Sequence, residues 1–223
     1  MWKSIIYKEW IKTRSAVAII VAVFLGVGIY SFITINANIR LTGIVNVWET
    51  AVQKDPLVFS YFQYLPLLAG ILLAITQYIP ELQFKRLKLT LHLPLNENKI
   101  LLTMLLYGIA VIALLLLVSM PLLLWDLSRQ FPREIVFSAH HQLIPWFFAG
   151  PAAYLLTSWV CLEPQWKQRI MNVIPALLFL SFFLFKAKSG AYQPFHPYLI
   201  VTAVIVCFFF PFYSTARFKE GVQ

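Results

Sequence analysis

The sequence predicts an all-α integral membrane protein with six transmembrane helices and with both chain ends in the cytoplasm. Hydrophobic residues make up 60% of the 223 residues and charged residues only 12%, against about 25% charge in an ordinary soluble domain. Long uncharged runs recur along the chain, and Lys and Arg gather on alternate connections between them. Composition, run length and charge distribution therefore agree on the membrane class.

Six uncharged runs approach or exceed the ~20 residues that cross ~30 Å of hydrocarbon as a helix. They cover residues 15–35, 58–79, 100–124, 142–162, 170–185 and 196–216 of a single transmembrane domain over residues 1–223. The fifth run is the shortest, because only 16 uncharged residues separate Arg169 from Lys186. It spans only if the bilayer thins or those cations snorkel, so five spans plus a re-entrant segment is the alternative.

The Lys and Arg distribution orients the six runs. With the N-terminus inside, the cytoplasmic segments hold twelve of the eighteen cations and the outer segments hold six, in the direction of the positive-inside rule. Omitting the fifth span would move the C-terminus outside. The outer connections, of about 22, 17 and 10 residues, are too short for a substrate-capturing domain of their own.

The net charge of +9 raises the question of nucleic-acid binding. The cations are spread over four cytoplasmic segments, and no basic groove with interleaved aromatic residues is visible. Anionic lipid headgroups explain the charge better. Membrane lipids are therefore an expected partner, and nucleic acid is not.

The sequence carries no motif for chemistry of its own. It lacks a phosphate-binding loop, H-E-x-x-H, C-x-x-C and the G-x-S-x-G elbow, and the six runs contain no Asp, Glu, Lys or Arg, which ion-coupled pumps use. His140 and His141 at the outer face, and His196 near the outer end of the last run, lack a Cys or Met cluster beside them. We expect no catalytic residue, metal site or cofactor in this chain.

The first cytoplasmic segment, residues 1–14, has an amphipathic pattern. Trp2, Ile6 and Trp10 recur at i, i+4 and i+8, with Lys8 and Lys12 on the other side. This predicts an interfacial helix along the inner leaflet. The alternative is a basic flank that only sets the orientation of the first span.

Residues 81–99 form a charged cytoplasmic island between two long uncharged runs. Drawn as a helix from Leu82, the island has two apolar stripes, one of Phe84, Leu87 and Leu91, the other of Leu82, Leu89 and Leu93. Each apolar stripe needs a surface to be buried against. One stripe would pack on the ends of the transmembrane helices or on lipid, and the other on a soluble cytoplasmic partner. A strand over residues 87–93 is the alternative, although a lone strand would have no pairing partner.

Two sequences in these segments resemble the permease subunits of type-2 ABC exporters. "IIYKEWIKTR" before the first span is similar to that family's elbow helix. Glu81, followed by "LKLTLHLPLNENKILLTMLLYG", is similar to its coupling-helix loop. Six spans with both termini inside extend the resemblance over nearly the whole chain. One departure is "KAKSGAYQPFHPY", which is brief where the family often inserts re-entrant helices between spans five and six.

The resemblance implies an assembly. Two permease chains, as a homodimer or heterodimer, would join two cytoplasmic ABC ATPase subunits, which bind the ATP and Mg, in the bacterial inner (cytoplasmic) membrane. This chain would be no enzyme by itself, and would couple ATP hydrolysis to export of a hydrophobic or amphipathic substrate. A non-transporting assembly factor or sensor, and an intramembrane enzyme using His140, His141 or His196, are the alternatives.

The resemblance also assigns residues. The membrane-interface face of the elbow would be Trp2, Ile6 and Trp10. The contact with the ATPase would be made by one acidic, three apolar and two basic residues of the coupling loop: Glu81, Phe84, Lys85, Arg86, Leu87 and Leu91.

Overall fold

The computed structural model of the chain describes residues 2–43, 46, 62–83, 97–184 and 196–219, and most of these residues are α-helical. The helices are α1 (Trp2–Thr42), α3 (Leu65–Gln83), α5 (Glu97–Ser128), α6 (Arg133–Leu162), α7 (Trp166–Phe183) and α8 (His196–Lys219). No strand occurs in these residues. The predicted all-α class is confirmed for the described residues, which form these six helices.

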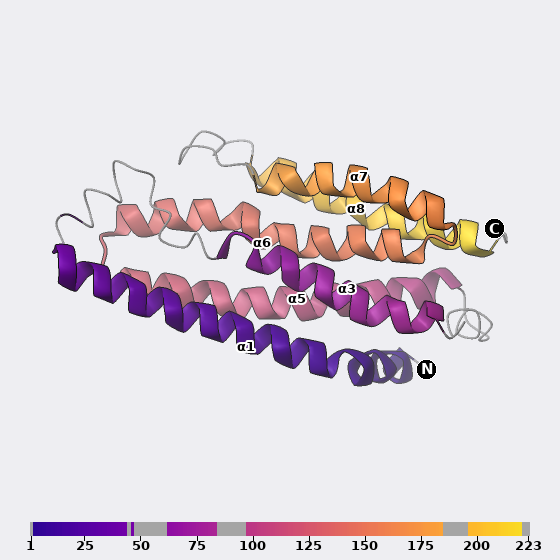
Figure 1. The fold of residues 1–223 in the computed structure, drawn as a ribbon, viewed down its shortest axis with the longest axis horizontal. Helices are drawn as coiled ribbons and strands as arrows, with labels where there is room; N and C mark the ends of the chain where they lie inside the picture. Colours follow the sequence, from indigo (N-terminus) through magenta and orange to yellow (C-terminus); the bar gives the residue numbers. More distant parts are fainter. Residues whose placement is uncertain (1, 44–45, 47–61, 84–96, 185–195, 220–223) are drawn as a thin grey trace.

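Successive helices run in opposite directions along one long axis (Figure 1). The N-terminus, the C-terminus, the end of α3 and the start of α5 therefore lie at the same end of the molecule. Helix α6 is central, because it packs against α3, α5, α7 and α8, while α1 packs against α3 and α5. We call the end that holds both termini the terminal end.

Four helices, α1, α3, α5 and α6, are long and apolar enough to cross a membrane. Their outward faces carry large apolar side chains, such as Leu114 and Leu117, which are 67% and 74% exposed. Apolar patches of this kind need a non-aqueous neighbour, which is consistent with a multi-pass membrane protein. Helix α7, formed by the short fifth run, is not among the four.

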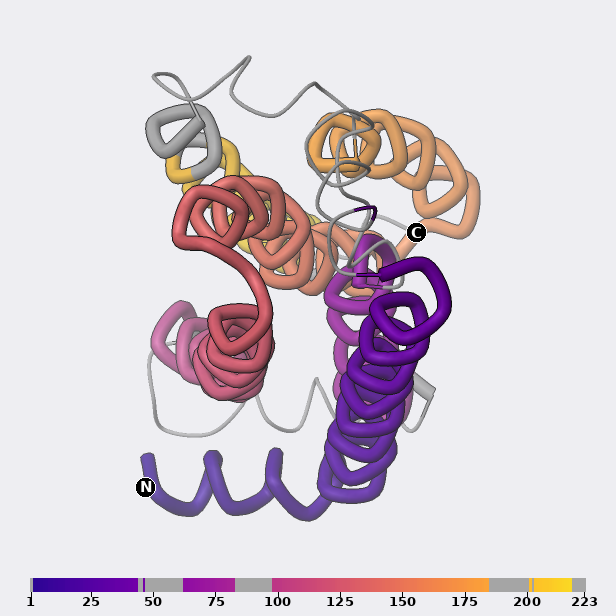
Figure 2. Tube along the Cα trace, turned by 90° about the vertical axis from the view of Figure 1, so that its left-hand side faces the viewer, coloured from indigo at the N-terminus to yellow at the C-terminus, as the bar shows by residue number. Residues whose placement is uncertain are grey.

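Helix α1 is continuous but not straight. Figure 2 shows that its first turns run across the terminal end, at a steep angle to the rest of the helix. The interfacial helix expected over residues 1–14 and the first span, 15–35, are thus two parts of one 41-residue helix.

The 17 residues predicted to connect the third and fourth runs are mostly helical. Helix α5 continues to Ser128 and α6 starts at Arg133, which leaves four residues between them. Helical hydrogen bonds continue beyond the hydrocarbon: the 30 residues of α6 extend about 45 Å, more than the ~30 Å of a bilayer core. Gln130 Nε2 donates to Asn36 Oδ1 at 3.2 Å, so this short turn is joined to α1.

The second predicted span, residues 58–79, is shifted in the structure. Helix α3 begins at Leu65, and residues 58–61 lie outside the described part. Pro66 sits in the first turn, where its missing N–H needs no partner. The helix then continues through Pro80 to Gln83, so Glu81 belongs to α3 and not to a loop.

Helices α3 and α6 cross at very close range. A Cβ atom added to Gly70 would lie 2.2 Å from the Gly150 carbonyl oxygen, and one added to Gly108 of α5 would lie 2.1 Å from the Tyr154 ring. Small residues permit such approach between membrane helices. A Cβ added to Gly26 of α1, in contrast, meets nothing within 4 Å.

Candidate functional site

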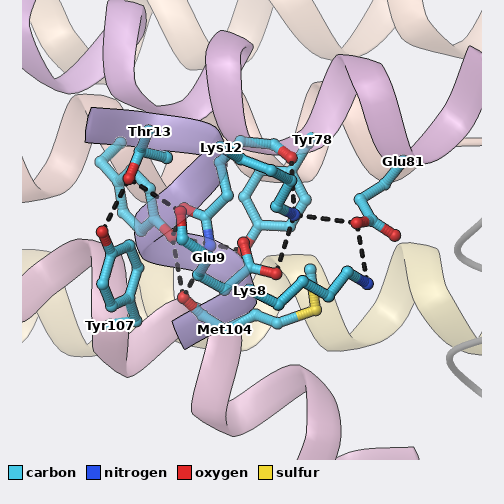
Figure 3. Close-up of polar contacts among 10 residues, drawn as sticks. Lys8, Glu9, Lys12, Thr13, Tyr78, Glu81, Met104 and Tyr107 are labelled. Atoms are coloured by element: carbon cyan, nitrogen blue, oxygen red, sulfur yellow. Dashed lines mark hydrogen bonds and ion pairs between the residues drawn. The ribbon is translucent and has the colours of Figure 1, made fainter. Parts of the chain in front are cut away.

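Four charged side chains meet where α1 crosses the terminal end, and we call Lys8, Glu9, Lys12 and Glu81 the N-terminal clamp (Figure 3). Lys12 Nζ lies 2.7 Å from Glu9 Oε1 and 2.9 Å from Glu81 Oε1. Lys8 Nζ lies 2.9 Å from the same Glu81 oxygen. Two ammonium groups therefore balance two carboxylates, and both bind α1 to the end of α3.

The members of the clamp differ in burial. The side chains of Glu9 and Glu81 are each 1% exposed, and that of Lys12 is 13% exposed, whereas that of Lys8 is 38% exposed. Glu9 Oε2 and Glu81 Oε2 are buried without a hydrogen-bond partner among the described residues. Removing one partner of a buried pair costs about 3–5 kcal/mol because an uncompensated charge remains. Lys12, which contacts both carboxylates, is thus the central member.

Helical spacing brings this face of α1 together. Ile5, Glu9 and Thr13 recur every fourth residue and are all buried. Thr13 Oγ1 donates to the Glu9 carbonyl oxygen at 2.9 Å and lies 2.7 Å from the Tyr107 hydroxyl. Since Thr13 has one hydroxyl proton, Tyr107 donates to Thr13, and this bond joins α1 to α5.

A second polar group, next to the clamp, joins α3, α5 and α6. Gln77 Nε2 donates to the Met104 carbonyl oxygen at 3.0 Å, and the Tyr154 hydroxyl donates to Gln77 Oε1 at 2.8 Å. The Tyr78 and Tyr154 hydroxyls are 3.3 Å apart. These side chains are buried and mutually paired, as polar groups inside an apolar bundle must be.

A separate carboxylate ties the last three helices together at the terminal end. Glu163 is the C-cap of α6 and its side chain is fully buried. Ser214 Oγ of α8 donates to Glu163 Oε2 at 2.6 Å, and Arg217 Nη1 lies 3.1 Å from Glu163 Oε1. Arg169 Nε of α7 donates to the Glu163 carbonyl oxygen at 2.6 Å. These cations offset a negative charge that the helix C-terminus disfavours.

Of the six residues assigned to the ATPase contact, the structure describes Glu81 alone. The Glu81 side chain is buried and forms ion pairs with Lys8 and Lys12, so it faces α1. The other five lie outside the described residues: Phe84, Lys85, Arg86, Leu87 and Leu91.

The predicted interface residues of the N-terminal segment lie on its surface. Trp2, Ile6 and Trp10 are 49%, 44% and 48% exposed, while Lys8 and Lys12 reach toward α3. The apolar set, Trp2, Ile6 and Trp10, therefore lies on a different side of α1 from Lys8 and Lys12, as the helical pattern predicted.

The outer histidines form no evident centre. The rings of His140 and His141 are 5.5 Å apart, and His141 Nδ1 lies 2.9 Å from the Phe137 carbonyl oxygen of its own helix. Within the part of the chain that the structure describes, no three His, Cys, Asp or Glu side chains gather as metal ligands would. His196 begins α8.

Sequence reasoning missed both buried carboxylates that organise the terminal end, Glu9 and Glu163. A signal existed for Glu9, because it is the single acidic residue among the first 42 and has a cation on either side at Lys8 and Lys12. Glu9 and Glu81, 72 positions apart in the sequence, share the Lys12 ammonium group. This arrangement depends on how α1 bends across α3. No local pattern contains that information.

The described helices define a helical chain with four candidate membrane spans, a polar terminal end and an apolar outer surface. No protein-family model, curated protein or solved structure matches the chain.

Proposed function

We propose that this chain is the membrane-spanning permease subunit of an ATP-driven ABC exporter of the type-2 kind. In this proposal six helices cross the membrane with both termini in the cytoplasm, and the cytoplasmic loop between α3 and α5 contacts a separate ATPase. The assembly contains two permease chains and two ATPase subunits. The cargo is a hydrophobic or amphipathic molecule.

The N-terminal clamp is the observation that carries the proposal. It binds the first turns of α1, which run across the terminal end, to Glu81, and Glu81 lies three residues before Phe84, the next residue assigned to the ATPase contact. A displacement of residues 84–96 would be passed to the end of α3 and, through Lys12, to α1. The proposed role of this chain, which has no phosphate-binding loop, is to transmit work that another subunit generates.

The geometry of the bundle supports the same proposal. The alternating directions of the six helices put both termini, the end of α3 and the start of α5 at one end, and twelve of the eighteen Lys and Arg fall in the segments assigned to that side. ATP binding would close the partner ATPases, move the loop as a lever and shift the two bundles relative to each other. The cargo path would open at their interface.

Co-purification tests the proposal. The full-length chain is solubilised from its native host and the recovered proteins are identified by mass spectrometry. We expect an ATPase with a phosphate-binding loop to accompany the wild type, and to be lost from the triple variant Phe84→Ala/Leu87→Ala/Leu91→Ala. The matched control is Leu114→Ala/Leu117→Ala/Val118→Ala, which removes three large side chains from an exposed face of α5 and should retain the ATPase.

Two outcomes would count against the proposal. Absence of any ATPase from folded wild-type protein would overturn it. Recovery of the ATPase together with no ATP-dependent movement of any hydrophobic or amphipathic probe in sealed vesicles would favour the sensor or assembly-factor alternative.

A further inference from the structure

In the first turns of α1, which run across the terminal end, the outward face differs in composition from the inward face. Lys3, Tyr7, Trp10 and Arg14 follow one another at intervals of four, three and four residues, so they form one stripe along the helix. All four are exposed. We call these four residues the outer stripe.

Charge is sorted between the two faces. Glu9, the single acidic residue of α1, is buried and paired with Lys12 on the inward face. Lys3 and Arg14 form no ion pair with any residue that the structure describes. The outer stripe therefore presents two positive charges, eleven residues or about three turns apart, with no acidic side chain of α1 beside them.

We propose that the outer stripe binds anionic phospholipid headgroups of the membrane that the bundle crosses, one near Lys3 and one near Arg14. Charge complementarity argues for this occupant, because an anionic headgroup supplies the negative charge that this face lacks. The aromatic residues between the cations agree, since Trp and Tyr favour the headgroup level of a bilayer. Figure 2 shows this segment crossing the end of the bundle, where headgroups would lie. The inference does not depend on the proposed export function.

Native mass spectrometry of the purified full-length chain, titrated with phosphatidylglycerol or with phosphatidylcholine of the same acyl chains, tests the proposal. We expect Lys3→Gln/Arg14→Gln to weaken phosphatidylglycerol binding by about fivefold per cation, and to leave phosphatidylcholine binding unchanged. Arg129→Gln/Arg133→Gln is the control, since it removes two cations at the opposite end and should not change the phosphatidylglycerol affinity.

Salt provides a test that needs no variant. Because exposed charges are screened within about 10 Å at 0.1 M ionic strength, the wild-type advantage of phosphatidylglycerol should shrink as ammonium acetate is raised. An advantage that does not respond to salt, or equal losses in both double variants, would overturn the proposal. Unchanged lipid binding combined with lost co-purification of a cytoplasmic protein would also overturn it, and would assign the stripe to a protein partner.

Discussion

Lys12 shows how burial decides the worth of an ion pair in this protein. Lys8 and Lys12 both lie 2.9 Å from Glu81 Oε1, so distance alone does not distinguish them. Lys12 is 13% exposed and also pairs with Glu9, whereas Lys8 is 38% exposed. Water and salt can replace Lys8 but have little access to Lys12.

Lys12→Met should therefore lower the stability of the chain far more than Lys8→Met. Lys12→Met leaves Glu9 without its cation and Glu81 with only the half-exposed Lys8, and we expect a loss of about 3–5 kcal/mol. Lys8→Met leaves the inner pairs in place, so its loss should be below about 1 kcal/mol. Equilibrium unfolding in mixed detergent, followed by circular dichroism, measures both. Equal losses would mean that burial does not set the strength of the clamp.

Among the elements, α3 and α6 show how small residues fix a helix crossing. Gly70 meets the backbone of Gly150, and a backbone atom cannot swing aside as a side chain can. Gly26 has the same chemistry in α1 but no neighbour within 4 Å of a Cβ. The sequence has a glycine at both places, and only the packing distinguishes the roles of the two.

Gly70→Ala should destabilise the bundle by about 1–3 kcal/mol, because the added methyl forces α3 away from α6. Gly26→Ala is the matched control. It should be neutral, or stabilising by up to about 1 kcal/mol, through the higher helix propensity of Ala. Thermal unfolding in the same detergent compares the two variants. A Gly70→Ala protein as stable as the wild type would show that the two helices are not in close contact.

On the scale of the whole molecule, the alternating helix directions decide which residues share an end of the bundle. Leu41 and Arg133 lie at one end of the bundle, and Ser4 and Lys167 lie at the terminal end. All four are exposed. If all six helices cross the membrane, the two ends lie on opposite sides of it, and this separation can be measured in intact cells.

Single cysteines test the topology in a background where Cys161 and Cys207, the two cysteines of the chain, are replaced by Ser. A membrane-impermeant maleimide should label Leu41→Cys and Arg133→Cys in intact cells, and Ser4→Cys and Lys167→Cys only after permeabilisation. A C-terminal epitope should also need permeabilisation if α7 and α8 both cross. An epitope accessible from outside would instead support five spans and a re-entrant α7.

The sequence by itself determined the all-α class of the described residues and the presence of helices long and apolar enough to cross a membrane. Run length and charge content are local properties, and the bilayer acts on each run separately. Helix ends were less predictable. The segments 125–128 and 133–141 looked like loop because they lie outside the apolar runs, yet they are helical, and Leu127, Ile135 and Ala139 in them are buried against the rest of the protein.

Only the tertiary structure decided the organisation of the terminal end. The sequence predicted Glu81 as a contact for a partner protein, whereas its carboxylate pairs with Lys12 of α1. Glu163 lies just beyond the fourth run, and its partners, Ser214 and Arg217, come from α8. Pairing between such distant residues depends on the rotation of each helix about its axis and on the bend in α1. These are set by the packing of the whole bundle, so no stretch of the sequence contains them.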